Sequence, residues 1–228
     1  MYMTKAEILP EKVFDSEVWN KLQSTYSIHQ LIWSLFSKNP DKKRDFLYRY
    51  EINGKVPTFY VVSKEKPSID NSYFNVDVKS YTPKVKEGQY FLFSLRANPV
   101  VTRKDVNGKH KRHDVVMDEK FRLKKSNPNP QNFPSISEIV HEKGLEWLDQ
   151  KGLKNGFMFD WNNVRADGYE THEFKKPKRK GQIRISTIDF DGMIKVTDID
   201  AFTKALYDGI GPSKSFGCGL MLIKPVKQ

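Results

Sequence analysis

Hydrophobic residues in the first third of the chain follow first a strand-like and then a helix-like spacing. From Ser16 to about Phe36 they recur near every 3.6 residues, which predicts a helical stretch with a break near Ser24-Thr25. Short β-rich runs lie on both sides of this stretch, and Asn53-Gly54 is typical of a hairpin turn between two of them. The predicted strands are residues 2–9, 44–53, 58–64 and 73–81. Their order, β-α-β-β-β, is that of the start of a ferredoxin-like unit.

The rest of the chain repeats much of this order. A strong apolar run at Gln89–Asn98 precedes a helix in which Ser135 and Glu138 have capping-box spacing. The segment 102–133 between them is polar and predicts a loop, and Asp191-Gly192 predicts a turn between two later strands. Further predicted elements are strands at 156–162, 164–174, 182–190, 193–196 and 217–224, and a helix at 198–208. We expect an α+β fold of two tandem ferredoxin-like (RRM-like) domains with antiparallel sheets, residues 1–85 and 86–228.

The RNA-recognition motif is one ferredoxin-like fold, and it binds through aromatic residues exposed on its strands. Its sequence signature is absent here, and the pattern around Tyr90, Phe91 and Phe93 is more typical of a core. Any contact with RNA is therefore expected at edges, loops and helices.

Composition narrows the function. The 228 residues carry 39 Lys and Arg against 28 Asp and Glu, a net charge of +11, with 13% aromatic residues. Such a balance favours a polyanionic partner, because cations attract phosphates and aromatic rings stack on bases. One cysteine, Cys218, excludes an intrachain disulfide, and no apolar run is long enough to span a membrane. Since the N-terminus also lacks a signal-peptide pattern, we expect a cytoplasmic protein with no membrane partner.

The basic residues gather in three segments: residues 42–44, 103–113 and 175–180. The third contains Lys175, Lys176, Lys178, Arg179 and Lys180 around one proline, with no acid to pair them. Such a block is either a solvated loop or a phosphate contact, and the overall charge favours the phosphate. None of the three lies on an amphipathic helix suited to a membrane surface, so nucleic acid is the favoured partner.

The glycine-rich segment Gly209–Gly219 matches neither a P-loop nor a dinucleotide-binding motif. Its free N–H groups, with Lys214 and two serines, would suit a phosphate, and a flexible turn explains the pattern equally well. Of the five histidines, His110 and His113 are three residues apart, but the cations around them oppose a metal ion, and a single cysteine excludes a site with several thiolates. We therefore expect no metal or other cofactor.

Tyr26 and His29 lie three residues apart in the predicted helix and therefore project from one face. Such a pair can cleave RNA without a metal, one group taking the proton from the 2′-OH and the other protonating the departing 5′-oxygen. The spacing allows either residue to be the acid or the base. A structural histidine at the border of the helix is the competing interpretation.

Four segments in order resemble the CasE (Cse3) family, the CRISPR RNA endoribonuclease subunit of the type I-E Cascade complex. They are Tyr26-x-x-His29-Gln30-x-x-Trp33-x-Leu35-Phe36, Arg44–Tyr48, Leu95–Pro99 and Gly209-Ile210-Gly211-Pro212-x-Lys214-Ser215-x-Gly217-Cys218-Gly219-Leu220. The resemblance implies two ferredoxin-like domains and metal-independent cleavage of precursor CRISPR RNA at the base of the repeat stem-loop. It also implies a 2′,3′-cyclic phosphate and a 5′-hydroxyl as product ends, with the guide RNA and other Cascade subunits as lasting partners.

By this resemblance the catalytic histidine is His29 and the assisting tyrosine is Tyr26, while the glycine-rich loop lies close to the RNA. The expected RNA contacts are Lys175, Lys176, Lys178, Arg179, Lys180, Arg184, Gly209, Gly211, Lys214, Ser215 and Gly217. Two alternatives remain: an RNA-hairpin-binding protein in which His29 is structural, and a metal-dependent nuclease. The absence of a carboxylate cluster from every motif argues against the second alternative.

Overall fold

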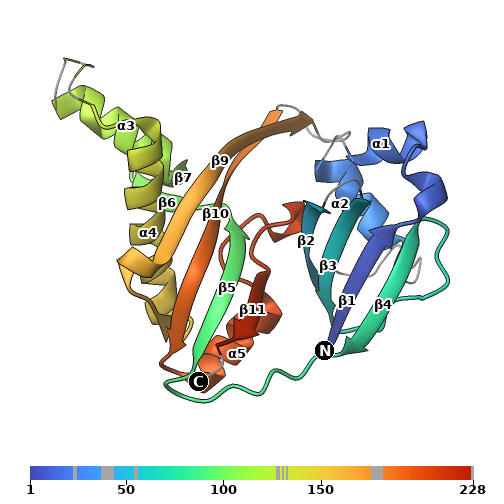
Figure 1. The fold of residues 1–228 in the computed structure, drawn as a ribbon. Helices are drawn as coiled ribbons and strands as arrows, with labels where there is room; N and C mark the ends of the chain where they lie inside the picture. Colours follow the sequence, from blue (N-terminus) through green and yellow to red (C-terminus); the bar gives the residue numbers. More distant parts are fainter. Residues whose placement is uncertain are drawn as a thin grey trace.

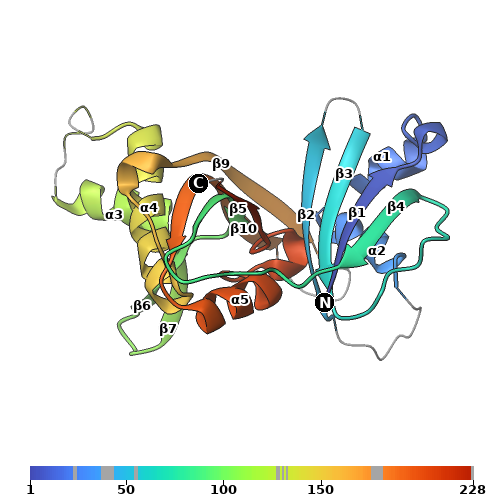
Figure 2. The same ribbon diagram turned by 60° about the horizontal axis from the view of Figure 1, so that its bottom comes forward.

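The chain forms two antiparallel sheets, one after the other in sequence, and each sheet has helices on one face (Figure 1). The computed structural model describes residues 1–22, 25–36, 44–53, 56–126, 129, 131, 133–175 and 182–226. A two-stranded hairpin forms a third, small sheet at the end of the molecule away from the N-terminal sheet (Figure 2).

The first sheet has the strand order β2-β3-β1-β4, which is that of a ferredoxin-like unit. Its strands are β1 (Tyr2–Ile8), β2 (Phe46–Asn53), β3 (Val56–Ser63) and β4 (Phe74–Ser80). The helices α1 (Ser16–Leu22) and α2 (Thr25–Trp33) connect β1 to β2 and confirm the predicted helical stretch, while residues 23 and 24 lie outside the described part. Ile28, Leu31 and Ile32 of α2 pack into the core of this unit. Residues 64–73, where a second helix would stand, are irregular.

The second sheet has the same topology. Its strands are β5 (Tyr90–Ala97), β8 (Phe157–Met158), β9 (Val164–Lys175), β10 (Gln182–Val196) and β11 (Met221–Pro225). The order β11-β5-β10 continues to β9 along one part of β10 and to β8 at its end. Helices α4 (Ile136–Lys154) and α5 (Ile199–Asp208) supply Leu148 and Phe202 to its core. The expected α+β fold of tandem ferredoxin-like domains with antiparallel sheets is therefore confirmed.

Helix α4 begins as its sequence predicts. The Ser135 hydroxyl accepts from the backbone N–H of Glu138, and the Glu138 carboxylate accepts from the backbone N–H of Ser135. This reciprocal pair satisfies two N–H groups that a helix start leaves without partners.

The two sheets have separate cores, joined by a small apolar contact. Leu47 and Val62 of the first sheet meet Leu220 just before β11. The Arg96 guanidinium on β5 crosses the same boundary and donates from Nη1 to the Tyr50 carbonyl over 3.1 Å. Because residues 81–89 are the only covalent link between β4 and β5, we propose a domain boundary near residue 85.

Residues 102–133 were predicted to be a loop, and that prediction is wrong for most of them. Strands β6 (Val100–Lys104) and β7 (His110–Asp114) form a hairpin, and α3 (Val115–Ser126) follows directly. Only Val115, Val116 and Leu123 join the core from α3. These few apolar residues among many cations make a pattern too sparse to predict a helix.

The turn predicted at Asp191-Gly192 is also wrong, because β10 continues through both residues. Gly192 pairs with Phe93 on one side and Val164 on the other. A Cβ at residue 192 would lie 2.2 Å from the Asn163 carbonyl oxygen. The glycine is therefore explained by the close approach of a neighbouring backbone within the sheet. Asn53 pairs with Val56, as expected for a hairpin, and Gly54 lies outside the described residues.

The prediction for the aromatic run in β5 is correct in part. Phe91 and Phe93 are buried, whereas Tyr90 is 40% exposed on the open face of the second sheet.

Candidate functional site

His29 lies on α2 at the border of the buried stripe, with its ring against two aromatic residues of β2. The ring centroids are 5.7 Å from Phe46 and 6.1 Å from Tyr48. Ile28 and Ile32 of the same helix are buried in the first core, which fixes this face of α2 against the sheet. His29 itself is half-buried, so it is held firmly and still reaches the surface.

A second side chain of α2 contacts the imidazole directly. The Trp33 indole, one turn further along, donates from Nε1 to Nε2 of His29 over 3.1 Å. An indole N–H only donates, so His29 Nε2 is the acceptor and the neutral ring carries its proton on Nδ1. The Trp33 ring packs edge-on against Phe46, with the centroids 5.1 Å apart. Trp33 thus sets both the position and the tautomer of His29.

Tyr26, the predicted partner of His29, lies in the first turn of α2. Its side chain is outside the described part of the structure. The pairing of Tyr26 with His29 therefore stays a prediction.

The glycine-rich loop joins α5 to β11 and includes a short 3-10 helix, η4 (Lys214–Phe216). Both α2 and β2 pack against η4, although the loop belongs to the second domain. The buried Tyr48 connects them, because its ring faces His29 and its hydroxyl donates to the Ser215 carbonyl over 3.2 Å. The fold therefore brings together the helix and the loop that the sequence had singled out separately.

Glycine is required at residue 209 for a structural reason. Its φ is +77°, and a Cβ there would lie 2.8 Å from Cδ1 of Leu47 in the first sheet. The loop can approach the other domain closely only because this side chain is missing. Gly211 faces the Trp147 ring, and Gly217 faces Tyr48. Contact of these glycines with a phosphate stays a prediction.

Two cations lie near this site. Arg44, just before β2, donates from Nη1 to the Phe46 carbonyl, and its guanidinium carbon is 5.9 Å from the Phe46 ring. Burial lowers the pKa of Arg44 and of Lys214. Asp208 opposes the shift of the Lys214 pKa, whereas the positive charge of Arg44 adds to it. Partly desolvated cations placed together favour a bound anion.

Arg44 had been interpreted as part of a basic turn with Lys42 and Lys43, which lie outside the described residues. The sequence does not show that Arg44 packs against Phe46. It also does not show that the loop with Lys214 lies near the same site, because only the fold brings these segments together.

A cavity of about 300 Å³ opens beside this site, between the two sheets. Ile28, Tyr48 and Gly217 form one part of its wall, and Arg96 and His172 form another. His172, on β9, had seemed an ordinary surface residue, and its Nε2 lies 3.2 Å from the Thr187 hydroxyl. The only signal in the sequence was its place in a strand, which does not identify a cavity.

The basic segment of the second domain lies in the sequence between β9 and β10. Lys176, Lys178, Arg179 and Lys180 are outside the described residues, as is the side chain of Lys175 at the end of β9. Arg184 on β10 is exposed, and its Nε lies 3.6 Å from a carboxylate oxygen of Glu173 on β9. RNA contacts by these residues stay predictions.

Among the residues that the structure describes, no three His, Cys, Asp or Glu side chains gather closely enough to hold a metal ion. Within the same ranges, no helix has the length and apolar character needed to cross a membrane.

Comparison with known proteins identifies the relatives of the chain. A family model described as "CRISPR associated protein" matches residues 1–225. The chain is 28% identical over 218 residues to the CRISPR system Cascade subunit CasE of Escherichia coli, covering 94% of this chain and 98% of that protein. It is 24% identical over 240 aligned positions to the CRISPR-associated endoribonuclease Cse3 of Thermus thermophilus, covering 99% and 100%.

Solved structures agree with these matches. The structure of CRISPR endoribonuclease Cse3 bound to a 19-nucleotide RNA superposes with a TM-score of 0.71 at 22% identity, covering 99% of this chain and 100% of that one. Cas6e from Escherichia coli superposes with a TM-score of 0.63 at 25% identity, with the same coverage.

Proposed function

The chain belongs to the CRISPR-associated protein family, and on that premise we propose that it is a cytoplasmic endoribonuclease that processes precursor CRISPR RNA. The proposal is supported by near-complete coverage of relatives named as a Cascade subunit and as an endoribonuclease. Its substrate is the repeat stem-loop, cut at the base of the stem. After the cut the protein stays on the guide RNA as a subunit of a Cascade complex.

The observation that carries the proposal is the contact of α2 with the glycine-rich loop around Tyr48. A half-buried imidazole, two cations and a cavity between the domains lie within one neighbourhood. This set suits cleavage of a phosphodiester, because a proton-transfer group and positive charges are the two requirements of that reaction.

In the proposed reaction the 2′-OH attacks the adjacent phosphorus, and the bond to the 5′-oxygen breaks. One of His29 and Tyr26 accepts the 2′-OH proton, and the other gives a proton to the departing oxygen. The products are a 2′,3′-cyclic phosphate and a 5′-hydroxyl. Arg44 and Lys214 stabilise the negative charge that grows on the phosphate oxygens, so the chain itself supplies the charge that a metal would otherwise provide.

The RNA outside the reacting phosphate is held by the second domain. The strands β9 and β10 extend toward α2 (Figure 1), and the block Lys175–Lys180 lies between them in the sequence. The major groove of a duplex RNA is deep and narrow, so these cations contact mainly phosphates near the end of the stem. Lys214 and Ser215 contact the backbone at the cut.

One observation favours a second candidate function. Nε2 of His29 already accepts a bond from Trp33, and the ring packs on Phe46 and Tyr48, as a structural histidine would. The alternative is an RNA-hairpin-binding protein that holds a guide without cutting it.

Incubation with the CRISPR repeat RNA of the same host in EDTA separates the two functions. The proposal expects one cut at the 3′ base of the stem, with a cyclic phosphate upstream and a 5′-hydroxyl downstream. Tight binding without a cut would establish the alternative. Cutting that stops in EDTA and returns with a divalent metal would overturn the metal-independent mechanism.

A further inference from the structure

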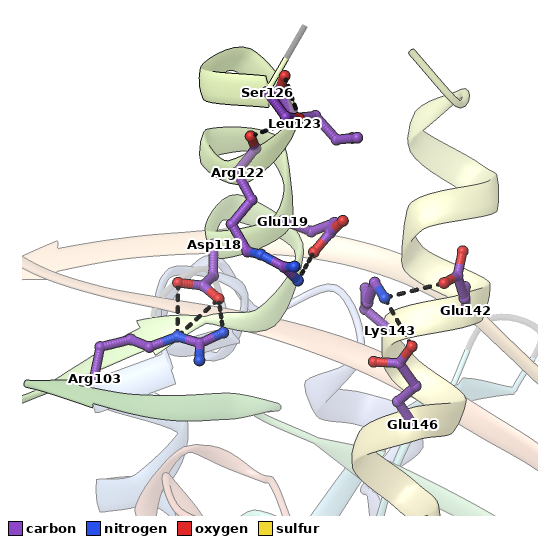
Figure 3. Close-up of polar contacts among 9 residues, drawn as sticks. All are labelled: Arg103, Asp118, Glu119, Arg122, Leu123, Ser126, Glu142, Lys143 and Glu146. Atoms are coloured by element: carbon purple, nitrogen blue, oxygen red, sulfur yellow. Dashed lines mark hydrogen bonds and ion pairs between the residues drawn. The ribbon is translucent and has the colours of Figure 1, made fainter.

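The β6–β7 hairpin presents two different faces. Side chains directly opposite each other in a hairpin lie on the same face, and successive side chains alternate. Arg103 is paired with Lys111 across the hairpin and also binds Asp118 of α3, with Nη2 2.5 Å from a carboxylate oxygen (Figure 3). That face lies beside α3, although the side chains of Arg103 and Lys111 stay exposed on it. The other face carries Thr102, Lys104, His110 and Arg112, all of them exposed.

The acidic residues of this region are all engaged. Residues 100–126 contain nine Lys and Arg but only four Asp and Glu. Asp105 pairs with Lys111 over 3.1 Å, and the Asp114 carboxylate accepts from the backbone N–H of Met117. On α3, the other two acids pair with arginines, Asp118 with Arg103 and Glu119 with Arg122 (Figure 3).

Six cations therefore remain without an acidic partner among the described residues: Lys104, Lys109, Arg112, Lys120, Lys124 and Lys125. On the neighbouring helix α4, the carboxylates of Glu142 and Glu146 already form ion pairs with Lys143 (Figure 3). Positive charges gathered in this way repel one another in the free protein. A polyanion removes that repulsion, which an isolated acidic side chain would do only in part.

Helix α3 adds an exposed aromatic ring to these charges. Phe121 is 59% exposed, and Met117, one turn before it, is 44% exposed. The Lys125 ammonium lies 4.6 Å from the centre of the Phe121 ring. Proteins that bind single-stranded nucleic acid combine an aromatic ring with nearby cations. A base stacks on the ring, and the phosphates of the backbone bind the cations.

The hairpin and α3 lie at the far end of the second domain, whereas α2 with His29 lies in the first domain (Figures 1 and 2). The nucleotides at the cut therefore cannot be those bound on this surface. We propose that the exposed side of the β6–β7 hairpin and α3 is a second RNA-binding surface, which holds a single-stranded segment outside the repeat stem-loop. The inference rests on the proposed function, because the repeat stem-loop bound there is continuous with the single-stranded segment.

The test compares two RNAs, the repeat stem-loop alone and the same stem-loop with a single-stranded extension of about 15 nucleotides. Extensions on the 5′ and the 3′ side are measured separately, in a His29→Ala background so that the RNA stays whole. The native surface is expected to bind one extended RNA more tightly than the stem-loop.

The variant Lys104→Gln, Arg112→Gln, Lys120→Gln and Lys124→Gln removes four of the unpaired charges, three at exposed positions and Lys120 at a partly exposed one. It should lower affinity for the extended RNA by about tenfold near 0.15 M salt, and reduce the salt slope by ~0.7 for each lost single-strand phosphate contact. Affinity for the stem-loop alone should not change. With His29 restored, this variant should cut the stem-loop at the native rate.

A matched control removes four exposed lysines of the first domain and its linker: Lys64→Gln, Lys66→Gln, Lys79→Gln and Lys84→Gln. This control should keep the preference for the extended RNA. An equal loss in both variants would mean a general effect of net charge and would overturn the inference. So would equal affinity of the native surface for both RNAs, or a variant that binds RNA normally but fails to join other protein subunits. If the protein does not bind or cut the stem-loop at all, the proposed function fails instead, which the stem-loop measurements reveal on their own.

Discussion

The Trp33 indole and the His29 imidazole are joined by a hydrogen bond of 3.1 Å within one turn of helix α2. The bond occupies Nε2, so Trp33 fixes which nitrogen of the neutral ring carries the proton. In the proposed reaction, His29 must exchange a proton with RNA, and its orientation before RNA arrives depends on this tryptophan.

Replacing Trp33 by Phe should slow cleavage while leaving RNA affinity unchanged. Phenylalanine keeps the packing against Phe46 but cannot donate to Nε2, so His29 loses its fixed orientation. We expect the single-turnover rate on the repeat RNA to fall by roughly tenfold. Trp161→Phe, at a partly exposed site in another part of the protein, is the matched control and should cut normally. An unchanged rate in the Trp33 variant would show that the bond has no part in the reaction.

Replacing His29 by Ala should abolish cutting. A general acid or base contributes about 10²- to 10⁴-fold, so the rate should fall by at least that factor. Affinity for the uncut stem-loop should stay within about twofold, because the surrounding cations remain in place. Gel analysis of cleavage and equilibrium binding of the same RNA measure both quantities. A large loss of affinity would mean that His29 anchors the RNA rather than reacting with it.

Lys214→Met should weaken RNA binding and stabilise the free protein. Burial lowers the pKa of Lys214, so its charged form is disfavoured in the folded state. This cost is fully present below the lowered pKa and disappears as pH rises through the ordinary lysine pKa, where the side chain is neutral in both states. The melting temperature of the variant should therefore exceed that of the native protein near neutral pH, and the gap should close in alkaline solution.

Lys204→Met, at an exposed position on α5, is the control for this change. It should leave the melting temperature and its pH dependence unaltered. Equal melting temperatures for Lys214→Met and the native protein at neutral pH would contradict the burial of an unfavourable charge at residue 214.

Tyr48→Phe should destabilise the protein by about 1 kcal/mol, because the Ser215 carbonyl loses its donor. Burial raises the pKa of Tyr48, so its hydroxyl stays protonated and keeps donating at every pH at which the protein is folded. The loss should therefore be the same at pH 6 and pH 9 in denaturant unfolding. Tyr90→Phe, on the open sheet face, should cost nothing measurable. A loss that grows with pH would contradict a neutral Tyr48.

Neutralising Lys175, Lys176, Lys178, Arg179 and Lys180 together should weaken binding of the stem-loop. The salt slope of the affinity should decrease by up to about one unit for each phosphate contact that is lost. Five exposed lysines elsewhere, Lys64, Lys66, Lys79, Lys84 and Lys86, make a control of equal charge. An unchanged slope in the first variant would show that this block faces solvent.

The sequence predicts the order of the main elements well because each strand or helix has a clear apolar period. The capping box at Ser135 and Glu138 is local, so its three-residue spacing is sufficient to locate the start of α4. The two ferredoxin-like units follow from the order of such elements and need no knowledge of contacts between them.

The sequence-based predictions fail where the role of a residue depends on contacts with residues distant in the sequence. Gly192 suggested a turn, yet it lies inside strand β10 against the backbone of Asn163. Likewise, the hairpin at 100–114 has few apolar residues, and its contact with α3 is an ion pair between Arg103 and Asp118 that no local pattern reveals.

The candidate site is predictable only in part for the same reason. His29 and Lys214 were found separately, from a helical spacing and a glycine-rich pattern. That Tyr48 and Arg44 join them depends on contacts between segments more than 160 residues apart in the chain, such as Tyr48 with Ser215.

The glycine-rich loop belongs to the second domain but packs against α2 and β2 of the first. A nascent chain that ends before residue 209 already contains every strand of the first sheet and α2 with His29, but not this loop. The surroundings of the imidazole are therefore completed only after η4, Lys214–Phe216, has left the ribosome. In the proposed mechanism, synthesis itself thus delays cleavage until both domains exist, because a product that ends before the loop has His29 but lacks Lys214.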